Sequence, residues 1–140
     1  MTNRMKVEFD SISANEAFAR VTVAAFLARL NPSVEEVADV KTAVSEAVTN
    51  AIIHGYQGEV HTITIEGELE GDLLTLRDEG VGIADIGQAM EPLYTSRPEL
   101  ERSGMGFLFM EAFMDEVLVE SEPGKGTCVT LRKRIGRGKD

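Results

Sequence analysis

The chain has 140 residues, 43% of them hydrophobic, which is enough for one core and too few for two, so we expect a single domain over residues 1–140. A formal net charge of −10 argues against direct binding to nucleic acid phosphates and favours a basic protein partner. One cysteine excludes an internal disulfide framework, and the absence of a signal peptide or a long apolar span predicts a cytoplasmic protein with no membrane segment.

The chain begins with a predicted strand and a predicted helix. Polar and apolar residues alternate in RMKVEFD, residues 4–10, which predicts a strand with one buried face. The run AFARVTVAAFLARL, residues 17–30, has the spacing of a helix. Ser13 is the expected N-cap of this helix, with Glu16 in the reciprocal position of a capping box.

A second long helix follows after Asn31-Pro32. Ser33 and Glu36 repeat the capping pattern, and the apolar spacing continues through residues 34–55. Gly55 is expected to end this helix.

The middle of the chain changes to strand periodicity. HTITIEGEL, residues 61–69, and LLTLRDEG, residues 73–80, alternate with period two around a turn at 70–72, which predicts an antiparallel hairpin. Residues 84–103 contain two prolines and several charges but no long periodic segment, so we expect a long loop there.

The last part of the chain predicts a helix and a second hairpin. GMGFLFMEAFM, residues 104–114, has a helical pattern, and strands are predicted at 116–122 and 127–135 around the turn PGKG. The order of elements predicts an α+β fold in which one layer of helices covers one sheet.

Glu46, Asn50 and His54 form a polar stripe on the second helix. Their spacing of four residues places them on neighbouring turns of nearly the same face, at the edge of the apolar surface that should pack on the sheet. Taken alone, such a stripe is more often a solvated helix face than a site.

Asp78, Gly80 and Gly82 form the motif DEGVG at the end of a predicted strand. Two glycines would let the backbone pass close to a flat ligand, and the carboxylate could accept a hydrogen bond from an exocyclic amine. The same residues are also ordinary turn chemistry.

Two further glycine-rich stretches lie downstream. Gly104 and Gly106 stand where a loop enters a helix, which suits either a phosphate seat or a plain hinge. Thr127 follows the turn PGKG and could face the same cavity as Asp78, although a hairpin turn explains these glycines without a ligand. Neither stretch matches a P-loop or a Rossmann fingerprint.

Together these four motifs, in this order, resemble the ATP-binding fold shared by DNA gyrase, MutL and histidine kinases, the GHKL or Bergerat fold. The resemblance covers nearly the whole chain and implies a two-layer α/β sandwich with helices on one face of a mixed, mainly antiparallel sheet. Within that superfamily, the chain length and the run SEAVTNAIIHGY resemble the small serine kinases that double as anti-sigma factors, especially the anti-sigma F factors of sporulating bacilli.

The resemblance implies a role for each motif residue. Asn50 would coordinate the Mg²⁺ that bridges the phosphates of ATP, and Glu46 would be the general base for the attacking hydroxyl. Asp78 would bind the adenine amino group. The other nucleotide-binding residues implied are Gly80, Gly82, Gly104, Gly106 and Thr127, with residues 84–103 as a lid over the nucleotide.

The resemblance also implies the activity and the partners. The protein would phosphorylate a serine of a small anti-anti-sigma protein, and it would otherwise bind and inhibit a sporulation sigma factor, sigma F, with ATP or ADP biasing the choice. A homodimer is implied, and Arg20 is a candidate contact for a protein partner. Two alternatives stay open: a nucleotide-gated sequestering protein without catalysis, and a detached histidine-kinase catalytic domain.

Overall fold

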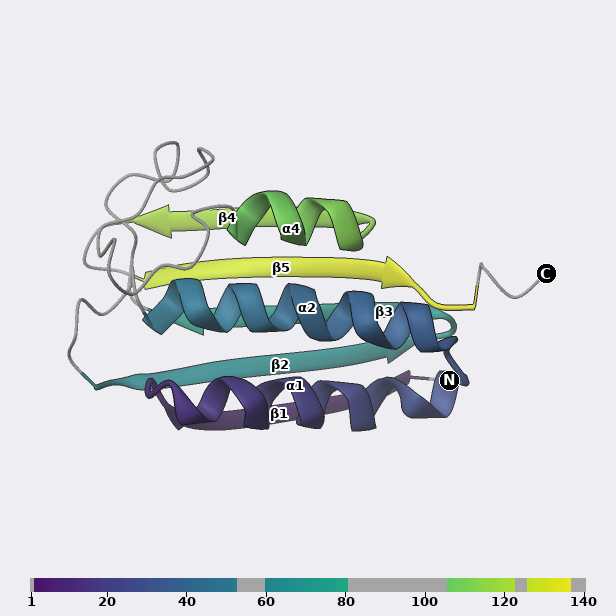
Figure 1. Cartoon of the computed structure of the whole chain (residues 1–140), viewed down its shortest axis with the longest axis horizontal. Helices are drawn as coiled ribbons and strands as arrows, with labels where there is room; N and C mark the ends of the chain where they lie inside the picture. Colours follow the sequence, from purple (N-terminus) through teal and green to yellow (C-terminus); the bar gives the residue numbers. More distant parts are fainter. Residues whose placement is uncertain (1, 53–59, 81–105, 123–125, 137–140) are drawn as a thin grey trace.

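The computed structural model describes residues 2–52, 60–80, 106–122 and 126–136 (Figure 1). The elements follow the predicted order of one strand, two helices, two strands, one helix and two strands. They are β1 (Thr2–Asp10), α1 (Ala14–Leu27) with a short 3₁₀ turn (Ala28–Leu30), α2 (Val34–Asn50), β2 (Thr62–Glu70), β3 (Leu73–Gly80), α4 (Gly106–Phe113), β4 (Glu116–Glu122) and β5 (Gly126–Arg134).

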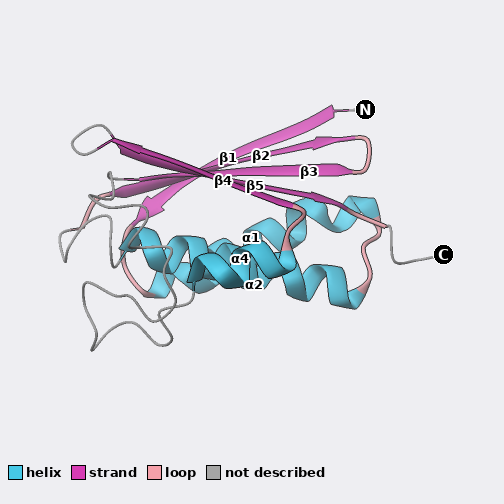
Figure 2. Cartoon of the chain, turned by 90° about the horizontal axis from the view of Figure 1, so that it is seen from above, coloured by secondary structure: helices cyan, strands magenta, loops and turns pink. Residues whose placement is uncertain are grey.

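The strands form one sheet in the order β1-β2-β3-β5-β4, and the helices α1, α2 and α4 lie together on one face of it (Figure 2). This arrangement confirms the predicted two-layer α+β fold. All four pairings between the described strands are antiparallel, so the parallel component that a mixed sheet would contain is not seen among them.

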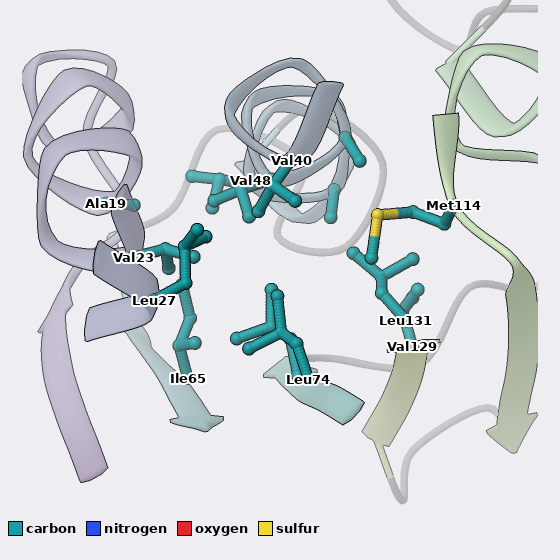
Figure 3. Packing of buried hydrophobic residues seen from close by; sticks show 14 of the residues in the cluster. Ala19, Val23, Leu27, Val40, Val48, Ile65, Leu74, Met114, Val129 and Leu131 are labelled. Atoms are coloured by element: carbon teal, nitrogen blue, oxygen red, sulfur yellow. The ribbon is translucent and has the colours of Figure 1, made fainter. Parts of the chain in front are cut away.

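The core fills the space between the helices and the inner face of the sheet. Because side chains alternate across a strand, every second residue of β2 and β3 points inward, including Ile65 and Leu74. Figure 3 shows these two residues meeting Val23 of α1 and Val40 and Val48 of α2. Burying such a side chain contributes roughly 1.5–3 kcal/mol, so this shared layer fixes α1 and α2 against the sheet.

Gly67 lets α1 come close to β2. It is an inward-facing position, and a Cβ placed there would lie 2.9 Å from the Phe26 ring and 3.1 Å from the Met5 side chain. The missing side chain therefore leaves the space in which the Phe26 ring packs on the sheet.

Glu36 fixes the start of α2, as the capping pattern predicted. The Glu36 backbone N–H donates to Ser33 Oγ at 3.0 Å, and Glu36 Oε1 accepts from the Ser33 backbone N–H at 2.8 Å. The second carboxylate oxygen, Oε2, accepts a 2.7 Å hydrogen bond from the Gly136 backbone N–H. One buried carboxylate thus joins the start of α2 to the chain just after β5.

The corresponding prediction for α1 is wrong. Ser13 has helical backbone angles and makes no side-chain capping bond. Asn15 instead donates to the Asp10 carbonyl oxygen at 2.9 Å, and Glu16 contacts other side chains. The turn is anchored by the end of β1 and not by a serine cap.

The α-helical hydrogen bonding of α2 ends at Asn50, earlier than the predicted end at Gly55. Ala51 and Ile52 continue as a wider, π-type turn, and Gly55 lies outside the described residues. Such turns within helices are often found at functional sites. No helix in the described ranges is long and apolar enough to cross a bilayer.

Candidate functional site

Four elements bring the predicted site residues to one end of the molecule. The last turn of α2, the end of β3, the start of β5 and the start of α4 all lie at the left of Figure 1. Antiparallel pairing of β3 with β5 produces this convergence, because it places Gly80 opposite Thr127 and Asp78 opposite Val129. The fold therefore gathers residues that are far apart in the sequence.

Asn50 and Glu46 occupy this end of α2 on successive turns. Asn50 is buried, with 6% of its surface exposed, and its amide nitrogen Nδ2 has no hydrogen-bond partner among the described residues. Glu46 is half-buried and already has an interaction partner. The general alternative for such a stripe, a solvated helix face, does not apply at Asn50, whose polar group is enclosed.

Asp78 is the most unusual polar residue of the site. It is 6% exposed on the inner face of the sheet, between Ile65 of β2 and Val129 of β5. Neither carboxylate oxygen has a hydrogen-bond partner among the described residues. Burial in this apolar setting, with the nearby negative charge of Glu79, raises the pKa of Asp78 to about 8.

Unpartnered buried carboxylate oxygens are costly, by roughly 1–3 kcal/mol for each unmade hydrogen bond. A fold keeps such a group when a ligand supplies the missing donor. Asp78 thus fits a group with a donor such as an exocyclic amine.

Thr127 completes the buried polar set. It is 8% exposed, it is the second residue of β5, and it already has an interaction partner. Asp78, Asn50 and Thr127 are therefore three buried polar side chains on the elements that meet at this end of the fold. Gly80 ends β3 opposite Thr127 and adds no side chain there.

Part of the predicted site cannot be placed. Gly106 is the first residue of α4. Gly82, Gly104 and the predicted lid at 84–103 lie outside the described residues, as does His54.

Metal binding at this end of the fold would depend on oxygen atoms supplied by a bound nucleotide. The described residues contain no group of three or more His, Cys, Asp or Glu side chains that could hold a metal ion. An amide oxygen nevertheless suits Mg²⁺, which commonly takes one or two protein ligands and completes its shell with water and phosphate oxygens. Asn50 therefore fits a metal that arrives with a nucleotide.

Sequence reasoning missed a connection between α1 and α2. Ser45, the neighbour of Glu46, donates a hydrogen bond to Glu16 Oε1. The same oxygen lies 3.0 Å from Arg20 Nε. Arg20 Nε lacks hydrogen-bond geometry, so this contact is an ion pair only. Glu16 and Arg20 are four residues apart on one helix, a spacing that suits an ion pair, whereas nothing in the sequence pointed to Ser45.

A cavity of about 610 Å³ lies beside this contact, and it too was missed. It is open to solvent and follows one face of α2, and Arg20 and Pro32 also line it. The α2 residues that line it are Val34, Val37, Ala38, Lys41, Thr42, Ser45 and Glu46.

The chain is similar to proteins of one family along nearly its whole length. The family model described as a histidine kinase-like ATPase domain matches residues 11–133. A protein of Geobacillus thermodenitrificans named anti-sigma F factor is 58% identical, over 99% of this chain and 97% of that protein. A protein of the same name from Clostridium beijerinckii is 60% identical, over 95% of each chain.

A solved structure shows the same fold. The RsbU and RsbW domains of a Mycobacterium tuberculosis protein match this chain with a TM-score of 0.69 and 22% sequence identity. The match covers 95% of this chain and 32% of the longer one.

Proposed function

The chain belongs to the anti-sigma F factor family and carries a histidine kinase-like ATPase domain, and from this premise we propose that it is an ATP-dependent protein serine kinase. Its substrate is a small anti-anti-sigma protein, which phosphorylation inactivates. Its other partner is a sigma factor, sigma F, which it binds and inhibits.

One observation carries the nucleotide part of this proposal. Asn50 and Asp78 are buried at the same end of the fold, and three of their polar atoms lack a partner among the described residues. ATP offers complementary groups at its two ends, an amino donor on adenine and oxygens on its phosphates. Both sets of unmade hydrogen bonds would be satisfied by one molecule.

Asp78 would hold adenine by accepting a hydrogen bond from the exocyclic amino group, with Thr127 beside it. Asn50 would reach the phosphate end, where its amide N–H donates to a phosphate oxygen and its amide oxygen coordinates Mg²⁺. Bound Mg²⁺ would supply neutralisation of the phosphate charge. The protein's own contribution would be alignment of the reactants.

Glu46 would act as the general base. It stands one turn before Asn50 on α2, and being half-buried it can still be reached from outside. The acceptor serine hydroxyl would transfer its proton to the Glu46 carboxylate as its oxygen bonds to the γ-phosphorus and the bond to the ADP oxygen breaks. A carboxylate contributes little to ATP binding itself, so its presence here favours catalysis over mere nucleotide sensing.

Partner choice would follow the nucleotide. A nucleotide changes the preference for one partner over another only by its different affinity for the two complexes. Arg20, with 39% of its side chain exposed on α1, is the proposed protein contact. We also propose a homodimer, since among the described strands β1 pairs with β2 alone and so leaves its other edge for a second copy.

The first alternative is a sequestering module in which nucleotide only orders the protein. The second is a detached histidine-kinase catalytic domain. The three differ in what happens to the γ-phosphate, which makes them separable in a single assay.

The test is incubation of the purified protein with Mg²⁺, γ-labelled ATP and a purified anti-anti-sigma protein, followed by acid treatment. Acid-stable label on the partner, absent with Glu46→Gln, is the expected result. Acid-labile label would indicate a histidine kinase. Tight ATP binding without any transfer would favour the sequestering module.

A further inference from the structure

The cavity beside Glu46 has the shape of a groove along α2. Its α2 residues, from Val34 to Glu46, recur at helical spacing and share one face. At the α-helical rise they cover about 18 Å. This length fits about five residues of an extended chain.

The groove leads to the proposed reaction centre. Glu46 lines its last part, and Asn50 follows one turn further along the same helix. α1 and α2 run side by side on the helical face of the molecule, so a segment lying along α2 would be guided between them toward this end (Figure 1). A side chain near the end of that segment would be presented to Glu46.

The chemistry of the lining changes along the groove. The part of the groove farthest from Glu46 is apolar and is lined by Pro32, Val34 and Val37. Val34 is 89% exposed. Two cations, Lys41 and Arg20, line the middle, in a chain whose formal net charge is −10. Arg20 is already ion-paired with Glu16, so Lys41 is the cation that the groove offers to a partner. Among the described residues, Lys41 has no ion-pair partner. An acidic segment with one apolar residue would therefore complement this lining.

We propose that the groove between α1 and α2 docks an extended acidic segment of the protein substrate and presents its serine to Glu46. Lys41 binds an acidic side chain of that segment, and Val34 and Val37 hold an apolar one. This inference rests on the proposed kinase function and adds to it the feature by which the acceptor segment is selected.

The test is a charge reversal at Lys41. The assay uses a purified anti-anti-sigma protein and measures KM and kcat of phosphate transfer, together with the Kd for the partner in the presence of a non-hydrolysable ATP analogue. We expect Lys41→Glu to raise KM and Kd at least about tenfold, with kcat and nucleotide affinity unchanged. Val34→Asp should act in the same direction without unfolding α2, because an acidic residue suits the first turn of a helix.

Arg134→Glu is the matched control. Arg134 is exposed on β5 and is not among the residues that line the groove, and its reversal changes the net charge by the same amount. If Arg134→Glu and Lys41→Glu raise KM equally, general charge attraction explains the effect and the groove assignment is wrong. An unchanged KM and Kd with Lys41→Glu also overturns it.

Two further outcomes are decisive. If Lys41→Glu changes the mass in light scattering, the groove is a contact between two copies of the chain and not a substrate site. If the wild-type protein binds the partner but transfers no phosphate, the kinase proposal fails by itself. The Kd values of the variants then still decide whether the groove is the docking site.

Discussion

Glu46 and Asn50 lie on successive turns of one face of α2, and they differ in burial: Asn50 is enclosed, whereas Glu46 is half-buried. We expect Glu46→Gln to lower kcat for phosphate transfer by about 10²–10⁴-fold, because the amide cannot accept the serine proton. The Kd for ATP should stay within about twofold of wild type, since the amide preserves the size of the side chain.

The exposed first-turn residue Glu35 provides the control. Glu35→Gln removes one carboxylate from the same helix and should leave kcat unchanged. Normal transfer by Glu46→Gln would remove Glu46 from the role of base.

The pKa of Asp78 predicts a pH dependence of stability. The unfolded chain releases this proton near pH 3.8, whereas the folded chain holds it to about pH 8. Below pH 3.8 both states are protonated and Asp78 has no effect. As the pH rises toward 8, only the unfolded state gains the favourable ionisation, so the free energy of unfolding falls, on the order of a few kcal/mol in total, and levels off above that pH.

Urea denaturation of nucleotide-free protein between pH 4 and pH 9 would measure this effect. Asp78→Asn should flatten the profile and stabilise the protein at neutral pH, whereas the same change at the exposed Asp10 should not. Equal profiles for wild type and Asp78→Asn would show that the carboxyl group ionises freely in the folded protein.

Asp78→Asn should have a second, opposite effect on the nucleotide complex. The asparagine side chain has only one acceptor oxygen. In the opposite orientation of the amide, its NH₂ group, a donor, would face the amino donor of adenine. ATP should therefore raise the melting temperature of wild type but not that of the variant. A full ATP-induced shift in the variant would argue against adenine recognition by Asp78.

Glu36 should be important for stability although it lies far from the site. Glu36→Ala removes acceptors for the Ser33 and Gly136 N–H groups, and we expect a loss of about 2 kcal/mol in the free energy of unfolding. Glu35→Ala, at the neighbouring exposed position, should cost less than about 0.5 kcal/mol. Similar losses for both variants would mean that only helix propensity is being measured.

Gly67→Ala should destabilise the protein by about 1–2 kcal/mol, because the added methyl group would push the Phe26 ring away from the sheet. The double variant Gly67→Ala, Phe26→Leu should show coupling, with the alanine costing less once the ring is gone. If thermal or chemical denaturation shows that the losses in free energy of unfolding of the two single variants simply add up in the double variant, the contact between position 67 and the Phe26 ring is contradicted.

Arg20→Ala tests the partner surface. Arg20 is paired with Glu16 but partly exposed, so its removal should weaken binding to the sigma factor or to the anti-anti-sigma protein by about tenfold while ATP affinity is kept. Calorimetry with each partner would measure this, and unchanged affinity for both would exclude Arg20 from the interface.

Local patterns predicted most of the fold. Alternation defined β2 and β3, because each has one face on the core, and the pair Ser33 and Glu36 forms a capping box whose partners are all local. The same pattern at Ser13 failed. Glu16 is held by Ser45 and Arg20, so tertiary contacts on α1 outweigh the local cap.

The site was predictable only in part for the same reason. Motif spacing selected Asn50 and Asp78, but their burial without partners depends on how β3 and α2 pack. No local pattern could reveal the groove, whose walls come from α1, the turn at Pro32 and α2.

The unpartnered atoms of Asn50 and Asp78 have a consequence for the cell under the proposed function. A ligand that binds only the folded chain stabilises it by an amount that grows with the logarithm of ligand concentration over Kd, about 2.7 kcal/mol at a hundredfold excess. Protein that has lost its nucleotide would unfold more often and meet proteases more often. The amount of this regulator, and not only its activity, would then follow the adenine nucleotide supply.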